Sequence, residues 1–129
     1  MKLLLDTKVL LWWLTDSERL TPRWRRLIGE PRHAVFVSAV SVVEIGLKTS
    51  SGKLPPLPEP IPEVLVTARF QELALTARHA QAVADLPWHH RDPFDRMLIA
   101  QALVEDLPVL TSDRIFETYG VRILDGSAA

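Results

Sequence analysis

The stretch KLLLDTKVLLWWL (Lys2–Leu14) joins two apolar patterns at one acidic residue. KLLL is a short, continuous apolar run, which is typical of a strand buried on both faces of a parallel sheet. TKVLLWWL follows directly and predicts a buried helix. Asp6 therefore marks the carboxyl end of the first predicted strand.

Short apolar strands and helices continue to alternate along the chain. We predict further strands at AVFVS (34–38), ELAL (72–75), PVLTSD (108–113) and VRIL (121–124). We predict helices over 22–29, 39–53, 63–70 and 76–86, from Pro93 onward, and in a short segment through Phe116. This alternation predicts an α/β fold with a central, mainly parallel sheet of about four to five strands.

The composition fits one folded domain of 129 residues, of which 47% are hydrophobic and 24% charged. The formal net charge is −1, but the arginines between Arg19 and Arg32 form either a local basic face for an RNA backbone or a solvated helix face. Cysteine is absent, which excludes disulfides and thiolate chemistry. No apolar run is long enough to cross a bilayer, so we expect a cytoplasmic protein without a membrane partner.

Four acidic residues lie at predicted strand ends or helix starts: Asp6, Glu44, Asp95 and Asp113. Because the carboxyl ends of parallel strands share the edge of the sheet where ligands bind, we expect the four to converge. Crowded carboxylates repel one another unless cations intervene, and oxygen ligands favour Mg²⁺ or Mn²⁺. Such ions activate water and stabilise the charge of an in-line attack on phosphorus.

Each acid also has a structural interpretation. Asp92, Pro93 and Asp95 fit the N-cap, N1 and N3 positions of a helix, and we expect Asp92 to be the cap. Asp6 and Asp113, taken singly, fit caps of the elements that follow them. Glu44 lies in an otherwise apolar segment, so an acid there needs a partner.

Basic residues beside the predicted site have two interpretations each. Arg96 and Arg114 follow predicted ligands directly, and they either contact a substrate phosphate or neutralise the neighbouring acids. His89, His90 and Arg91 precede the helix in a predicted loop, where histidines are usually exposed to solvent. A role in substrate binding is the alternative for these loop residues.

Four motifs resemble, in order and spacing, the PIN-domain toxins of the VapC type: LLLDTKVLLWWL, SAVSVVEIGLKTSSGKL, HHRDPFDRMLIAQA and VLTSDRIF. The resemblance extends from Met1 to about Leu124. It implies one PIN-like, three-layer α/β/α domain over residues 1–129, with a short tail at 125–129. It also implies a Mg²⁺- or Mn²⁺-dependent endoribonuclease that leaves a 5′-phosphate and a 3′-hydroxyl. Such a toxin would belong to a type II toxin–antitoxin pair, form a homodimer and be inhibited by a VapB-like antitoxin.

The resemblance also implies roles for individual residues. The catalytic acids and metal ligands would be Asp6, Glu44, Asp95 and Asp113. Thr7 and Thr111 would orient the carboxylates or bound water, and Asp92 would cap the helix and support the site rather than bind metal. Lys8 departs from the family pattern, in which His or Asn is common. It either pairs with Asp6, binds phosphate or has no role.

Two other functions fit the same residues. One is a metal-dependent phosphodiesterase that acts on DNA or structured RNA in a different process, and cleavage assays on both nucleic acids test it. The other is a non-catalytic module that binds nucleic acid or protein, in which the acids only cap helices. For that module, titration with Mn²⁺ should give no heat and no thermal shift.

Overall fold

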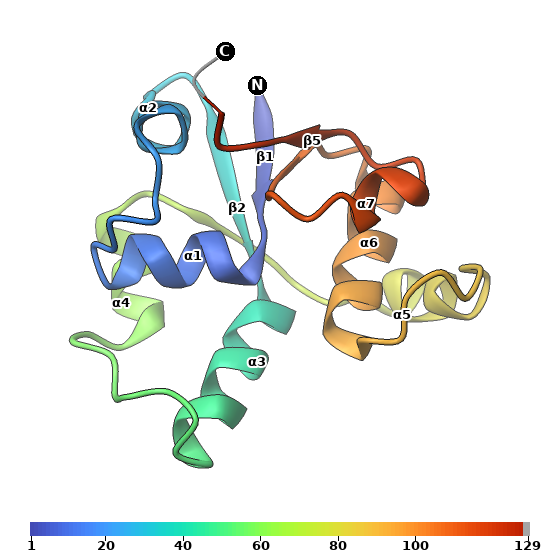
Figure 1. Cartoon of the computed structure of the whole chain (residues 1–129), viewed down its shortest axis with the longest axis horizontal. Helices are drawn as coiled ribbons and strands as arrows, with labels where there is room; N and C mark the ends of the chain where they lie inside the picture. The colour runs from blue at the N-terminus through green and yellow to red at the C-terminus, as the bar shows by residue number, and fades with distance from the viewer. Residues whose placement is uncertain (128–129) are drawn as a thin grey trace.

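A five-stranded sheet lies at the centre of the protein, in a computed structural model that describes residues 1–127 (Figure 1). The strands are β1 (Lys2–Leu5), β2 (Ala34–Ser38), β3 (Gln71–Leu73), β4 (Val109–Leu110) and β5 (Ile123–Leu124). The helices are α1 (Thr7–Leu14), α2 (Pro22–Gly29), α3 (Ala39–Ser50), α4 (Ile61–Thr67), α5 (Ala77–Ala84), α6 (Pro93–Glu105) and α7 (Ile115–Thr118). All strand pairs are parallel, which confirms the predicted fold class. Residues 128–129 of the expected tail lie outside the described residues.

The strand order β3-β2-β1-β4-β5 creates a switch point between β1 and β4. From β1 the chain continues through β2 and β3 on one side, whereas β4 and β5 lie on the other side. Leu5 is in register with Leu110, and the amide of Asp6 donates to the Leu110 carbonyl over 3.1 Å. The residues that follow β1 and β4 therefore lie side by side, where open α/β sheets bind ligands.

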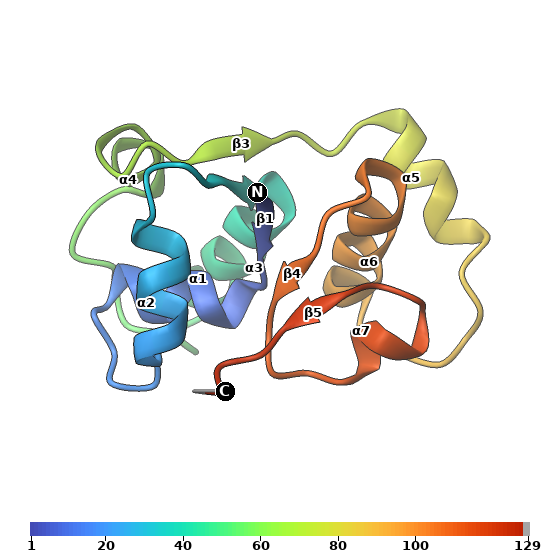
Figure 2. The same cartoon turned by 90° about the horizontal axis from the view of Figure 1, so that it is seen from above.

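Helices cover both faces of the sheet, as the apolar run of β1 predicts. Leu3 and Leu5 join one buried cluster with α1, α2 and α4, whereas Leu4 joins a second cluster with α6 and α7. All three leucines are 0% exposed. Figure 2 shows α1, α2 and α4 on one side of the sheet and α5, α6 and α7 on the other. The architecture therefore has three layers.

Helix starts follow the capping signals in the sequence. The hydroxyl of Thr21 accepts a hydrogen bond from the Trp24 amide, and Pro22 occupies the first turn of α2. Thr76 caps α5 in the same way. These caps lie where the sequence predicts them. A hydroxyl residue before a helix accepts a hydrogen bond from a free amide of the first turn, and this local contact does not depend on how the helix packs.

The region of α4 and β3 differs from the prediction. A helix was predicted over 63–70, but α4 ends at Thr67 and Arg69 adopts a left-handed conformation with φ 60°. The Phe70 amide bonds the Leu65 carbonyl over 2.9 Å, and the Arg69 amide bonds that of Val66 over 3.2 Å. This closure resembles a Schellman motif, but without the usual glycine. It allows Phe70 to enter the first cluster, and β3 to start at Gln71 rather than Glu72.

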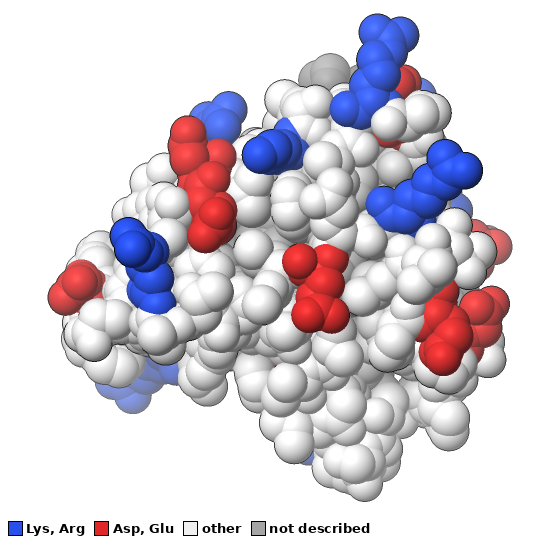
Figure 3. Space-filling view, turned by 180° about the vertical axis from the view of Figure 1, so that it is seen from behind, with Lys and Arg blue, Asp and Glu red and all other residues white. Residues whose placement is uncertain are grey.

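Several of the arginines between Arg19 and Arg32, for which a basic face and a solvated helix face were the alternatives, are paired with acids. Three of these arginines form ion pairs of 3.0 to 3.5 Å: Arg23 with Asp125, Arg25 with Asp16 and Arg32 with Glu30. On the back of the molecule, basic side chains are interspersed with acidic ones (Figure 3). The solvated-face interpretation therefore fits better. Within residues 1–127, none of the helices combines the length and apolar composition of a membrane span.

Candidate metal centre

Asp6 and Thr111 meet at the switch point. Asp6 directly follows β1, and Thr111 directly follows β4. The Thr111 hydroxyl donates to Asp6 Oδ2 over 2.7 Å and accepts from the Asp113 amide over 3.0 Å. Thr111 is 0% exposed, so its hydroxyl is held between the two acids. The predicted orienting role of Thr111 fits this contact with Asp6.

The surroundings of Asp6 disfavour its negative charge. Asp6 is 7% exposed. Burial, together with the nearby charges of Asp95 and Asp113, raises the pKa of Asp6 to about 6 from an ordinary value of 3.8, despite the hydrogen bonds from Thr111 and the Thr7 amide. A cation beside Asp6 would remove this cost.

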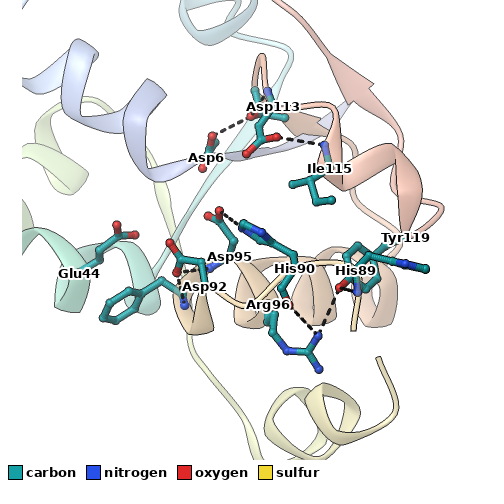
Figure 4. Close-up of polar contacts among 12 residues, drawn as sticks. Asp6, Glu44, His89, His90, Asp92, Asp95, Arg96, Asp113, Ile115 and Tyr119 are labelled. Atoms are coloured by element: carbon teal, nitrogen blue, oxygen red, sulfur yellow. Dashed lines mark hydrogen bonds and ion pairs between the residues drawn. The ribbon is translucent and has the colours of Figure 1, made fainter. Parts of the chain in front are cut away.

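The first turn of α6 presents Asp95. The Asp92 carboxylate accepts hydrogen bonds from the amides of Phe94 and Asp95, so Asp92 caps α6 as predicted. His90 Nε2 lies 2.9 Å from Asp95 Oδ2. Burial raises the pKa of Asp95, with increases from the charges of Asp92 and Glu44 that oppose the effect of His90. Figure 4 shows Asp95 below Asp6 with the His90 ring directed toward it, and Glu44 to one side on α3.

Asp113 is exposed at the start of the turn that leads into α7. Its Oδ1 accepts a hydrogen bond from the Ile115 amide over 3.0 Å, which is the capping contact that its structural interpretation predicts. The same side chain also lies near the other acids. His90, Asp95 and Asp113 each offer one ligand atom, and these atoms all lie within 4.8 Å of one another.

Glu44 enters the site from α3 and is 7% exposed. Its Oε2 lies 2.7 Å from Lys48 Nζ, one helical turn further along α3. Within the described residues, its buried Oε1 has no hydrogen-bond partner. Lys48 is therefore the partner that the sequence requires for Glu44, but it contacts only Oε2. The other carboxylate oxygen, Oε1, remains available for another ligand.

Thr7 contacts Asp6 through its backbone amide, whereas Lys8 does not pair with Asp6 among the described residues. The Thr7 hydroxyl lies 2.8 Å from the Ser41 hydroxyl and links α1 to α3, whereas its amide bonds Asp6. Thr7 thus supports the site through its backbone and through helix packing. Lys8 is exposed and, among the described residues, forms no ion pair with Asp6.

Arg96 and Arg114 were each predicted to contact a substrate phosphate or to neutralise nearby acids, and among the described residues neither forms an ion pair with a predicted metal ligand. Arg96 is 4% exposed, and its guanidinium points away from Asp95 (Figure 4). It donates to four carbonyls and one hydroxyl: those of Val83, Leu86, Pro87 and His90, and that of Tyr119. Arg114 is exposed and pairs with Glu117 and Asp125 rather than with a predicted ligand.

Sequence reasoning missed two residues of the site, His90 and Lys48. His90 was expected to be a solvated loop residue, and nothing in the sequence distinguishes it from His89. Lys48 carried a usable signal, because a glutamate followed by a lysine four residues later forms an ion pair on a helix.

These residues fit a divalent cation. Asp6 and Glu44 are buried acids from distant parts of the chain, and Asp95 and Asp113 lie beside Asp6. The free Oε1 of Glu44 and the raised pKa of Asp6 are the features that a bound cation would satisfy. Carboxylate oxygens with one imidazole suit Mn²⁺, and carboxylates alone suit Mg²⁺.

The fold and this acidic site together define a class of nuclease. The family model of the PIN domain matches residues 3–121. The chain therefore belongs to the PIN-domain family, whose members are nucleases. A search of curated proteins gave no match.

Solved structures with the same fold come from several bacteria. VapBC2 from Rickettsia felis, bound to a DNA fragment from its promoter, is 12% identical with a TM-score of 0.74, over 98% of this chain and 100% of that chain. FitAcB from Neisseria gonorrhoeae is 22% identical with a TM-score of 0.68, over 98% and 99%. DNA-bound VapBC from Salmonella typhimurium is 19% identical with a TM-score of 0.64, over 98% and 99%. At these identities the likeness shows the fold alone.

Proposed function

We propose that this protein is a divalent-metal-dependent endoribonuclease, the toxin of a type II toxin–antitoxin pair. The observation that supports the proposal is the grouping of Asp6, Asp95 and Asp113 near the switch point of the sheet, with Glu44 close enough to Asp95 to raise its pKa. The metal ligands would come from Asp6, Glu44, Asp95 and Asp113. A bound Mg²⁺ or Mn²⁺ ion would supply water activation and charge stabilisation for hydrolysis at phosphorus.

Other side chains of the protein would hold these ligands in position. Thr111 fixes Asp6 through its hydroxyl, and His90 fixes Asp95 through Nε2. Lys48 holds one oxygen of Glu44, and the other is buried without a hydrogen-bond partner among the described residues. Because a metal site depends on such supporting hydrogen bonds, these three residues are positioning residues in the proposal.

Apolar side chains near the site support a protein partner. Val43 and Leu47 lie one turn apart on α3, like Glu44 and Lys48, and are 54% and 55% exposed. Val43, Phe94 and Met97 line an apolar pocket of about 260 Å³ between α3 and α6. We infer that a VapB-like antitoxin covers this region, and that a homodimer forms as in the family. The VapBC and FitAB complexes with the same fold support this inference.

Cleavage of labelled, single-stranded RNA of mixed sequence tests the proposal. With Mg²⁺ or Mn²⁺, the wild-type protein should cut RNA and leave 5′-phosphate ends, and EDTA should stop the reaction. Asp6→Asn should lower the rate by about 100-fold or more, because it removes one buried charge from the metal site. Asp16→Asn, at an exposed acid in an ion pair with Arg25, is the matched control.

Three outcomes would contradict the proposal. Asp6→Asn protein that cuts RNA with unchanged metal dependence would exclude the assigned site. Equal cleavage of single-stranded DNA would favour the more general phosphodiesterase. A protein that cuts neither, and gives no heat with Mn²⁺, would be a binding module.

A further inference from the structure

Trp88 is a large apolar side chain that the fold leaves open to solvent. It is 78% exposed, in the loop that joins α5 to α6. The other three tryptophans, Trp12, Trp13 and Trp24, pack in or against the first core cluster. Burial of a tryptophan is strongly favourable, so an exposed one needs an explanation other than stability.

One face of the Trp88 ring is already occupied. The Arg96 guanidinium carbon lies 4.0 Å from the ring centroid, which is cation–π contact distance. Arg96 is itself 4% exposed and held by five hydrogen bonds, so it forms a fixed support beneath the ring. The high exposure of Trp88 means that its other face is open.

The backbone on both sides of Trp88 is fixed as well. The Pro87 carbonyl accepts hydrogen bonds from Arg96 over 2.9 Å and from the Tyr119 hydroxyl over 2.7 Å. The His89 amide donates to the same hydroxyl over 3.0 Å, and the His89 ring packs edge-on against Tyr119. Trp88 is thus presented with little conformational freedom to lose when a ligand binds, which favours binding.

Trp88 also lies close to the acidic site. It precedes His90 by two residues, and His90 contacts Asp95. Two residues span at most about 7 Å of extended chain, so the Trp88 backbone lies near that of His90, while its ring stacks on the Arg96 guanidinium, which points away from Asp95 (Figure 4). Arg91, exposed in the same loop, adds a positive charge.

The geometry points to Trp88 as a stacking platform for an unpaired nucleobase of the RNA strand that flanks the acidic site. This inference rests on the proposed ribonuclease function and specifies its substrate as single-stranded RNA. Proteins that bind single strands combine basic groups with aromatic rings on which bases stack, and such stacking tolerates any base. A Trp88 that only stacks on Arg96 would affect the stability of the loop, but it would not make RNA binding depend on the presence of the bases.

Binding of short oligoribonucleotides in EDTA tests this inference apart from cleavage. The ligands are octamers of adenosine and a matched octamer with abasic riboses, which keeps the phosphates and removes the bases. Wild-type protein should bind the adenosine octamer more tightly, and Trp88→Leu should weaken that binding by about 5- to 150-fold. Wild-type protein and Trp88→Leu should bind the abasic octamer with equal affinity. Trp88→Phe should retain much of the affinity, and Val66→Ala, at an 80% exposed valine on α4, should bind as wild type.

Fluorescence and kinetics provide independent readouts. Octamer binding should quench emission in the wild-type protein but not in Trp88→Phe. In cleavage assays with Mg²⁺, Trp88→Leu should raise KM and leave kcat nearly unchanged.

The inference is overturned if Trp88→Leu weakens adenosine and abasic octamers equally, or neither. It is also overturned if Trp88→Leu leaves RNA binding intact but changes the monomer–dimer equilibrium in sedimentation, which would assign Trp88 to self-association. If base-dependent binding is found but RNA is never cut, the stacking site stands and the ribonuclease function fails.

Discussion

At the scale of single residues, the site is built from groups that are unfavourable on their own. Asp6 is a buried carboxylate beside two other acids, and Glu44 carries a buried oxygen without a hydrogen-bond partner among the described residues. An isolated protein gains nothing from this arrangement, because desolvation and repulsion both oppose the charges. The arrangement is consistent with a site shaped for a cation.

The raised pKa of Asp6 predicts how stability depends on pH in the absence of metal. The pKa is about 6 in the folded protein and 3.8 as the ordinary value, so the folded state binds the proton more tightly. Its contribution to stability is therefore complete below about pH 4 and is lost as the pH rises through about 6, by roughly 3 kcal/mol. In Asp6→Asn this loss should disappear, so the variant should be at least as stable as wild type at pH 7.5. Because the pKa of Asp95 is also raised, Asp6→Asn should still lose some stability as the pH rises, but less than wild type does.

Urea unfolding in EDTA at pH 4.5 and pH 7.5 measures this effect. The asparagine retains an oxygen that accepts from Thr111, so the substitution removes charge but not the hydrogen bond. Asp16→Asn, at a position with φ 48° that asparagine tolerates, should keep the wild-type pH dependence. An Asp6→Asn protein clearly less stable than wild type at pH 7.5 would contradict the argument.

At the scale of elements, α6 and the loop before it form one unit. The sequence predicts the start of α6, because Asp92 and Pro93 are local signals for the N-terminus of a helix. It does not predict the role of Arg96, because the carbonyls that Arg96 binds face it only after the loop folds back over the helix. The end of α4 is unpredictable for a similar reason, since burial of Phe70 imposes a left-handed conformation on Arg69.

Arg96 is expected to be the main anchor of this unit. Arg96→Met should lower the free energy of unfolding by about 3 kcal/mol or more, because it removes charge-assisted hydrogen bonds and leaves carbonyls without their donor. Urea unfolding measures the change. Arg114→Met, at an exposed arginine, should have little effect and serves as the control. Equal stabilities of the two variants would show that Arg96 does not hold the loop.

At the scale of the whole molecule, the strand order brings the acids together. Sequence patterns indicate that acids follow strands, and parallel sheets place such residues on one edge, so the convergence could be predicted. The sequence does not reveal that β4 pairs with β1, which places Thr111 against Asp6 and Asp113 beside them. Such pairings depend on packing across 105 residues of chain, which no local pattern encodes.

Anomalous X-ray diffraction from crystals grown with Mn²⁺ would locate the proposed metal ion. We expect a manganese peak bounded by the carboxylates of Asp6, Asp95 and Asp113, and a marked loss of that peak in crystals of Asp6→Asn. A wild-type map without a peak at the carboxyl ends of β1 and β4, or an equal peak in both proteins, would contradict this expectation.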